Sequence, residues 1–111
     1  MLFRSAKVQR RAAGIGFDFR TPEGAAAKVR EELDELSSAP ADRVEDELGD
    51  VLFAVAALGR RYGVDPETAL RKATARFALR FEAMRTQARA AGVELETLSE
   101  DELLARFRAA R

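Results

Sequence analysis

The 111-residue sequence contains no cysteine, no histidine and no tryptophan. Without cysteine, the chain has no disulfide framework and no thiol chemistry. The joint absence of cysteine and histidine disfavours zinc, iron and copper sites, which draw on those ligands. It also excludes a cysteine nucleophile and a histidine base. A catalytic site in this chain has to be built from other side chains.

An excess of one charge and long apolar runs are also missing. The 19 basic and 19 acidic residues cancel, which argues against general binding to nucleic acid or to a membrane. No apolar run approaches the ~20 residues of a membrane span, and the N-terminal MLFRSAKVQRR is too polar for a signal peptide. We therefore expect a cytoplasmic protein. Its length favours one domain, residues 1–111.

Helix start and stop signals predict an all-α fold. Thr21-Pro22-Glu23 and Asp65-Pro66-Glu67 each combine an N-cap, a proline and a first-turn acid. Ser99 with Glu102, and Asp42 with Glu45, resemble capping boxes. Glycines 14, 16, 63 and 92 mark helix ends. The expected helices cover about 2–13, 22–36, 42–62, 66–90 and 100–110.

Apolar spacing predicts which side chains are buried. The run 51–59 is apolar nearly all round, so we expect it to be the central element, at the rim of a core or a dimer interface. Phe17 and Phe19 fit a core role better than ligand stacking. The other residues at core spacing are Val29, Leu33, Leu36, Leu70, Ala73, Phe77, Phe81 and Met84.

Acidic residues are concentrated in residues 28–51, which contain nine carboxylates and only three basic side chains. Glu32 and Glu35 are three residues apart, so they share a helix face. Glu47 and Asp50 repeat the spacing after the short turn SSAPAD, which predicts an antiparallel hairpin. That hairpin would place Glu35 near Glu47 and Glu32 near Asp50.

Four converging carboxylates need compensating cations. An all-oxygen set suits Mg²⁺, or Mn²⁺ in its place, completed by waters and phosphates. The alternative is a charged surface hairpin that binds no metal. Arg76 and Arg80, one helical turn apart, could hold a phosphate or pair with surface acids. No GxxxxGK[ST] loop is present, so the chain is not a P-loop enzyme. The carboxylates and the two arginines instead indicate metal-dependent hydrolysis of a phosphorylated small molecule.

The motifs EELDE (31–35) and ELGD (47–50) resemble the Glu-Glu-x-x-Glu and Glu-x-x-Asp signature of the MazG nucleoside triphosphate pyrophosphohydrolases, in the all-α NTP pyrophosphatase superfamily. The likeness extends over residues 7–19, 28–36, 45–81 and the final helix, and matches the family's C-terminal catalytic domain. It implies hydrolysis of a nucleoside triphosphate to monophosphate and pyrophosphate. It also implies a bundle that forms a homodimer or a dimer of dimers.

The resemblance assigns roles by position. Glu32, Glu35, Glu47 and Asp50 would bind Mg²⁺, with Glu31 as an auxiliary catalytic acid. The family has a lysine and an arginine near the triphosphate where this chain has Arg76 and Arg80. It has a tryptophan and a lysine near the base where this chain has Phe107 and Arg111, which leaves base preference open. The substrate-binding residues expected in this way are Lys28, Arg76, Arg80, Phe107 and Arg111.

Two other functions fit the sequence. One is a sister enzyme of narrow specificity: a dUTP or dCTP pyrophosphatase, or the phosphoribosyl-ATP pyrophosphohydrolase. These enzymes share the acidic signature and differ in the base pocket. The other is a non-catalytic helical dimerisation module with an acidic face.

Overall fold

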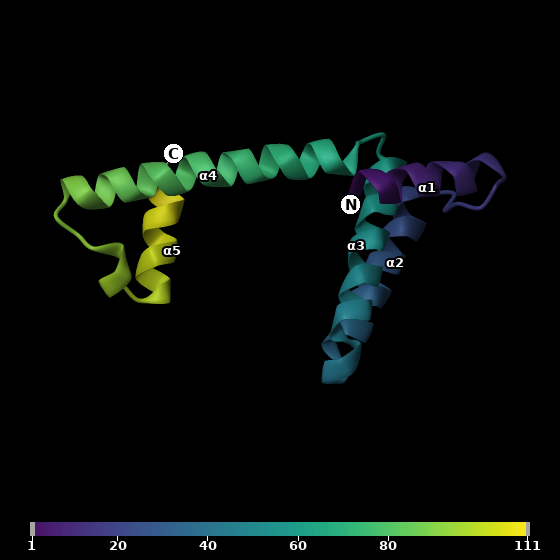
Figure 1. Ribbon diagram of the computed structural model, residues 1–111, viewed down its shortest axis with the longest axis horizontal. Helices are drawn as coiled ribbons and strands as arrows, with labels where there is room; N and C mark the ends of the chain where they lie inside the picture. Colours follow the sequence, from purple (N-terminus) through teal and green to yellow (C-terminus); the bar gives the residue numbers. More distant parts are fainter. Residues whose placement is uncertain (1, 111) are drawn as a thin grey trace. The chain divides into compact units, whose positions relative to one another are not determined.

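The computed structural model describes residues 2–110, with side chains from Arg4 onward. Over this range the chain is helical and has no strand, which confirms the all-α prediction. Figure 1 shows the course of the helices. Their bounds are α1 Leu2–Gly14, α2 Pro22–Ser37, η1 Ala41–Arg43, α3 Val44–Arg61, α4 Pro66–Ala90, η2 Leu95–Thr97 and α5 Glu100–Ala109.

Contacts divide the chain into two compact units, which we describe separately. Unit 1 spans Met1–Ala69 and unit 2 spans Leu70–Arg111, so the boundary lies within α4. In unit 1, α2 and α3 pack along each other as the predicted hairpin, and α1 packs on α3 (Figure 1). In unit 2, Arg80 of α4 contacts the C-terminal end of α5. A single domain over residues 1–111 stays a prediction.

Local signals predicted the helix starts well, with one exception. The Thr21 side chain accepts a hydrogen bond from the Gly24 amide, and Asp65 accepts from the amide of Glu67. The capping box at Ser99 is present. The Asp42 box is wrong, because a 3₁₀ turn precedes α3 and no side chain caps that helix. The chain enters α3 through continuous helical backbone, so the amides that a cap would satisfy are already in a turn.

The buried apolar residues of unit 1 are small. Ala25 of α2 and Val51, Ala54 and Ala57 of α3 are buried, which lets α2 and α3 approach closely. Larger apolar side chains remain outside, including Leu52 and Phe53 on α3. Helix α3 is therefore buried in unit 1 only on the face that carries its small residues.

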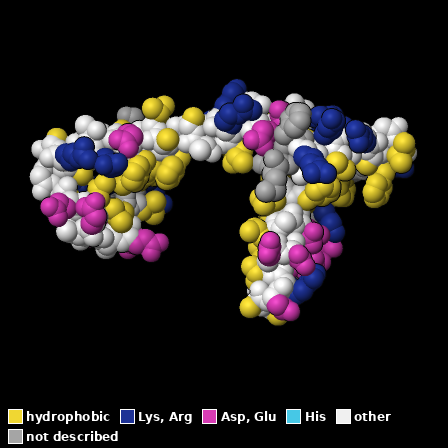
Figure 2. Space-filling model, viewed as in Figure 1, with side chains coloured by type: hydrophobic (Ala, Val, Ile, Leu, Met, Phe, Trp, Pro, Cys, Tyr) yellow, Lys and Arg dark blue, Asp and Glu magenta, His cyan; other side chains and the backbone are white. Residues whose placement is uncertain are grey.

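Several core predictions are wrong for the single chain. Leu33 is 45% exposed and Phe77 is 59% exposed, and only Met84 of the predicted stripe on α4 is buried. Phe17, expected in the core, is 79% exposed. The physical reason is that the described elements cover these faces only in part, and Figure 2 shows hydrophobic side chains on the surfaces of both units. The remaining members of the stripes that are exposed are Leu70, Ala73 and Phe81.

Among residues 2–110, no helix is long and apolar enough to cross a membrane.

Candidate functional site

The α2–α3 hairpin brings the acidic residues of both helices together. One carboxylate oxygen each of Glu32, Glu47 and Asp50 lie within 4.8 Å of one another. Glu31, Glu32 and Glu35 form a second such group on α2, so Glu32 belongs to both. The predicted convergence across the turn is thus confirmed for Glu32, Glu47 and Asp50, whereas Glu35 groups with Glu31 and Glu32 on its own helix. We call these five residues the acidic cluster.

The negative charges of the acidic cluster also act on Glu35. The charge of Glu32 is the main cause that raises the pKa of Glu35 above its ordinary value, and the charge of Glu47 on α3 adds to it. A raised carboxyl pKa means that the protonated form is favoured by neighbouring anions. The carboxylates of the acidic cluster therefore repel one another in the absence of a cation.

Two members of the acidic cluster are shielded from water. Glu32 is only 6% exposed and the Glu47 side chain 16%, whereas Asp50 is exposed. The Oε2 atoms of Glu32 and Glu47 are buried and have no hydrogen-bond partner among the described residues. An unpaired buried carboxylate oxygen is costly, so the arrangement calls for a donor or a cation from outside the chain.

The opposite oxygen of each buried carboxylate is near a basic side chain. Lys28 Nζ lies 3.0 Å from Glu32 Oε1, and Arg43 Nη2 lies 3.8 Å from Glu47 Oε1. The hydrogen bond to Glu32 is the main cause that raises the pKa of Lys28. Neither Lys28 nor Arg43 binds the Oε2 atom of its glutamate. Several carboxylate oxygens with incomplete neutralisation fit a hard divalent cation such as Mg²⁺.

A pocket of about 520 Å³ adjoins this cluster within unit 1. Glu32 and Asp50 belong to its wall, and most of the remaining wall comes from α1, the loop after it and α3. Its size falls within the range of small-molecule sites, about 300–1,000 Å³. The other residues that line it are Val8, Gln9, Ala12, Phe17, Asp18, Phe19, Lys28, Phe53, Ala54, Ala57 and Arg60.

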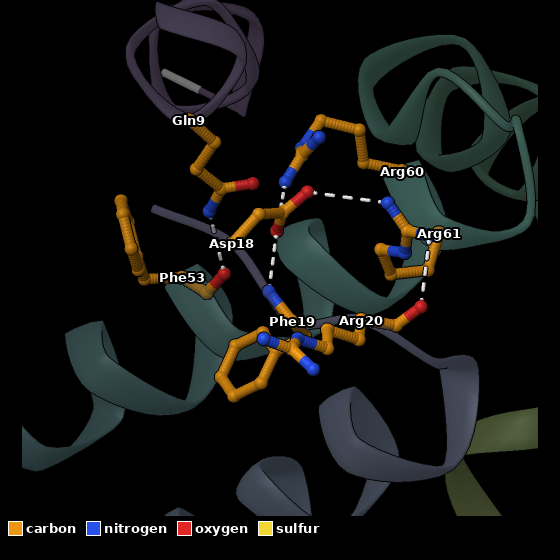
Figure 3. A network of polar contacts seen from close by, with 7 residues as sticks. All are labelled: Gln9, Asp18, Phe19, Arg20, Phe53, Arg60 and Arg61. Atoms are coloured by element: carbon orange, nitrogen blue, oxygen red, sulfur yellow. Dashed lines mark hydrogen bonds and ion pairs between the residues drawn. The ribbon is translucent and has the colours of Figure 1, made fainter. Parts of the chain in front are cut away.

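An ion-pair network holds the loop that carries Phe17 and Phe19 (Figure 3). Asp18 binds the guanidinium of Arg60 and lies 3.2 Å from Arg61 Nη1, both at the end of α3. Arg61 also donates to the Arg20 carbonyl at 3.2 Å. The hydrogen bond from Arg60 is the main cause that lowers the pKa of Asp18. The network fixes one wall of the pocket to α3.

The sequence analysis missed this network and Gln9. Gln9 Nε2 donates to the Phe53 carbonyl at 2.9 Å, which joins α1 to α3. A signal for Gln9 was present, because it lies three residues after Ala6 and four before Ala13, on a face that is otherwise apolar. Asp18 and Arg60 are 42 residues apart, and nothing in either local sequence links them.

The predicted substrate-binding residues after Ala69 belong to unit 2. Arg80 donates from Nε to the carbonyls of Phe107 and Ala110 at 2.8 and 2.9 Å, and its guanidinium lies 4.6 Å from the Phe107 ring centre. Its described partners are therefore neither phosphate nor a surface acid but the end of α5. Arg76 is exposed, and Arg111 lies outside the described residues. The ring of Phe107 packs 5.2 Å from that of Phe77.

Comparison with known proteins agrees with the acidic signature. The chain is 43% identical over 103 residues to the nucleoside triphosphate pyrophosphohydrolase/pyrophosphatase MazG of Thermotoga maritima. It is 39% identical over 110 residues to the nucleoside triphosphate pyrophosphohydrolase of Escherichia coli K12. These alignments cover 92% and 89% of this chain but only 40% and 42% of the relatives.

A family model also matches the chain. It is described as phosphoribosyl-ATP pyrophosphohydrolase and covers residues 17–77. This range contains the loop after α1, the whole hairpin with its acidic cluster and the first half of α4. By this match over more than half of its length, and by its likeness to the MazG enzymes, the chain belongs to the phosphoribosyl-ATP pyrophosphohydrolase family, with its MazG-like all-α fold.

Proposed function

We propose that this chain hydrolyses nucleoside triphosphates to the monophosphate and pyrophosphate, in a reaction that depends on Mg²⁺. The observation that carries the proposal is the pair of buried, unpaired Oε2 atoms on Glu32 and Glu47, within a group of three carboxylates from two helices. The relatives from Thermotoga maritima and Escherichia coli are named for the same class of reaction. The adjoining pocket offers space for the rest of a nucleotide.

The proposed metal ligands are Glu32, Glu35, Glu47 and Asp50. A bound Mg²⁺ would neutralise phosphate oxygens and lower the pKa of a coordinated water. The hairpin fixes its ligands on two packed helices, which suits a site that must keep its geometry during turnover. Mn²⁺ prefers similar oxygen ligands and should replace Mg²⁺.

Two further residues of α2 act on the substrate side in this proposal. Glu31, whose side chain is 58% exposed and 3.4 Å from Lys28, is positioned to accept a proton from an attacking water. Lys28 lines the pocket and keeps its positive charge, so it can attract a phosphate that competes for its ion pair with Glu32. Both roles rest on the exposure and position of the side chains next to the acidic cluster.

Arg76, Arg80, Phe107 and Arg111 are proposed to contact the triphosphate and the base by resemblance alone. For Arg80 the structure supports a structural role as well, since its guanidinium already donates hydrogen bonds to carbonyls at the end of α5. Arg76, which is exposed, is the better candidate for a direct phosphate contact. The ring of Phe107 is in contact with both Arg80 and Phe77.

We also propose that the active form is a homodimer or a dimer of dimers. The support is the exposure of large apolar side chains on α3, where Leu52 is 49%, Phe53 48% and Val55 45% exposed. Large apolar side chains exposed together on one helix favour an interface between protein chains. Light scattering coupled to size exclusion tests the assembly: a monomer at micromolar concentration would contradict it.

Release of pyrophosphate, rather than orthophosphate, from a panel of NTPs and dNTPs with and without Mg²⁺ tests the activity. We expect turnover only with the metal, and its loss in Glu32→Gln and Asp50→Asn. Glu45→Gln is the matched control, because Glu45 is an exposed acid of the same hairpin outside the acidic cluster. Retained turnover in the two ligand variants would contradict the assignment. The absence of pyrophosphate release with every nucleotide would favour a non-catalytic dimerisation module.

A narrow substrate range is the second candidate, because the matching family model carries the description phosphoribosyl-ATP pyrophosphohydrolase. The same panel should therefore include phosphoribosyl-ATP, dUTP and dCTP. Activity confined to one of these three would replace the broad specificity that the MazG resemblance implies.

A further inference from the structure

The same five-residue pattern ends in a shielded glutamate on each helix of the hairpin. Residues 28–32 read KVREE and residues 43–47 read RVEDE, so each has a basic residue, an acid three positions later and a glutamate four positions later. Residues three and four positions apart are neighbours on a helix surface. Each basic side chain can therefore pair with either of two acids, and the second of these, Glu32 or Glu47, belongs to the acidic cluster.

The two basic residues pair differently. Lys28 Nζ lies closer to the shielded Glu32, at 3.0 Å, than to the exposed acid of its pattern, at 3.4 Å. Arg43 instead donates from Nη1 to Oδ2 of Asp46 at 2.8 Å, while its Nη2 lies 3.8 Å from Oε1 of Glu47, too far for a hydrogen bond. Glu32 is thus in direct contact with a basic side chain, whereas Glu47 is not.

Exposure to water explains why Arg43 pairs with Asp46. The Asp46 side chain is 63% exposed and the Arg43 side chain 53%, so this pair forms while both charges stay hydrated. The Glu47 side chain is only 16% exposed, and a guanidinium that contacted it would lose part of its hydration. A basic residue four positions before a glutamate is also the less favourable order on a helix. While Asp46 holds Arg43, the charge of Glu47 remains available to a metal ion.

We infer that Asp46 is a positioning residue that acts through Arg43: by holding the guanidinium, it keeps Arg43 from competing with the divalent cation for the carboxylate of Glu47. The inference rests on the proposed function, because Glu47 is a proposed metal ligand. Asp46 itself lies outside the acidic cluster. An acid that is not a ligand would then raise the affinity of the site for its metal.

The affinity for Mn²⁺ alone, measured by electron paramagnetic resonance without nucleotide, tests the inference. Asp46→Ala should release Arg43 to pair with Glu47 and weaken Mn²⁺ binding about three- to fivefold, near the upper limit for one exposed ion pair. Asp46→Glu, which keeps an acid within reach of Arg43, should restore the wild-type affinity. Glu45→Ala is the matched control, because Glu45 is another exposed acid in the first turn of α3. It should change the affinity less than about twofold, since solvent screens its charge.

The Arg43→Gln background separates this mechanism from a direct effect of the Asp46 charge. With the competing cation removed, Mn²⁺ should bind at least as tightly as to the wild type, and adding Asp46→Ala should change the affinity less than about twofold. If Asp46→Ala weakens binding equally in both backgrounds, Asp46 acts by its own charge and the inference is overturned. Weaker binding in Arg43→Gln also overturns it, since Arg43 would then support Glu47 as a ligand.

Thermal unfolding in EDTA completes the test. Asp46→Ala and Arg43→Gln should keep Tm within a few degrees of the wild type, because exposed ion pairs contribute little to stability. A larger fall in Asp46→Ala would mean that affinity is lost through the fold, and would overturn the inference. A wild type that binds no Mn²⁺ would refute the proposed metal site and the inference together. A wild type that binds Mn²⁺ in the expected pattern but releases no pyrophosphate would refute the proposed function alone.

Discussion

The Asp18 network gives a quantitative test of how the pocket wall is held. Asp18→Asn keeps the size of the side chain and removes its charge, so the hydrogen bonds from Arg60 and Arg61 lose their ionic component. The side chains of Asp18 and Arg60 are only 14% and 16% exposed, so solvent screens this pair less than an ordinary surface pair. Hydrogen bonds to charged groups contribute about 1.5–3 kcal/mol, and we expect a loss of about 2 kcal/mol.

In a domain of this size, 1 kcal/mol shifts Tm by roughly 4–8 °C, so Asp18→Asn should lower Tm by roughly 10 °C. Thermal unfolding followed by circular dichroism measures the shift. Asp42→Asn is the control, because Asp42 is an exposed carboxylate on the 3₁₀ turn. Equal Tm values for the two variants would refute the assigned role of the network.

The effect should depend on pH in one direction. Arg60 lowers the native pKa of Asp18 below the ordinary value of 3.8. A carboxyl with a lowered native pKa stabilises the fold fully above its unfolded-state pKa, and that contribution is lost as the pH falls through the native pKa. The Tm difference between wild type and Asp18→Asn should be constant near neutral pH and shrink below about pH 4. A difference that grows in acid would contradict the assigned direction.

Three further predictions concern the acidic cluster and unit 2. Because the charge of Glu32 raises the pKa of Glu35, Glu35→Gln should maintain or raise Tm at neutral pH in EDTA. The Tm difference between this variant and the wild type should vanish in acid, where Glu35 is protonated in the wild type. A lower Tm of the variant at neutral pH would contradict this. Ser99→Ala removes the capping box of α5 and should cost about 1 kcal/mol in chemical denaturation, whereas Thr97→Ala, outside the box, should cost less. Arg80→Lys keeps the charge but loses the bonds to the end of α5, so it should lower Tm; an unchanged Tm with reduced kcat/KM would assign Arg80 to phosphate binding alone.

Features set by neighbouring residues in the sequence could be predicted. Thr21 and Ser99 cap their helices because each hydroxyl accepts from the amide three residues ahead, which depends on local backbone only. The convergence of Glu32 with Glu47 and Asp50 followed from helical spacing and a short turn. These parts needed no knowledge of distant contacts.

Features decided by distant contacts could not be predicted in the same way. The helical period on α4 correctly grouped Phe77 with Phe81, but burial depends on what covers a face, and within the described chain both rings remain exposed. Gln9 and Asp18 acquire their roles from α3, more than 40 residues away. The pocket, which lies between α1 and the hairpin, was therefore missed although its acidic end was predicted.

Binding of Mn²⁺, followed by electron paramagnetic resonance in the presence of a non-hydrolysable nucleoside triphosphate analogue, tests the central claim most directly. The claim is that Glu32, Glu35, Glu47 and Asp50 hold a divalent cation between two helices. We predict saturable binding in the wild type and in Glu45→Gln, and a loss of at least about tenfold in affinity in Glu47→Gln. Equal Mn²⁺ affinity in Glu47→Gln and the wild type would contradict the account.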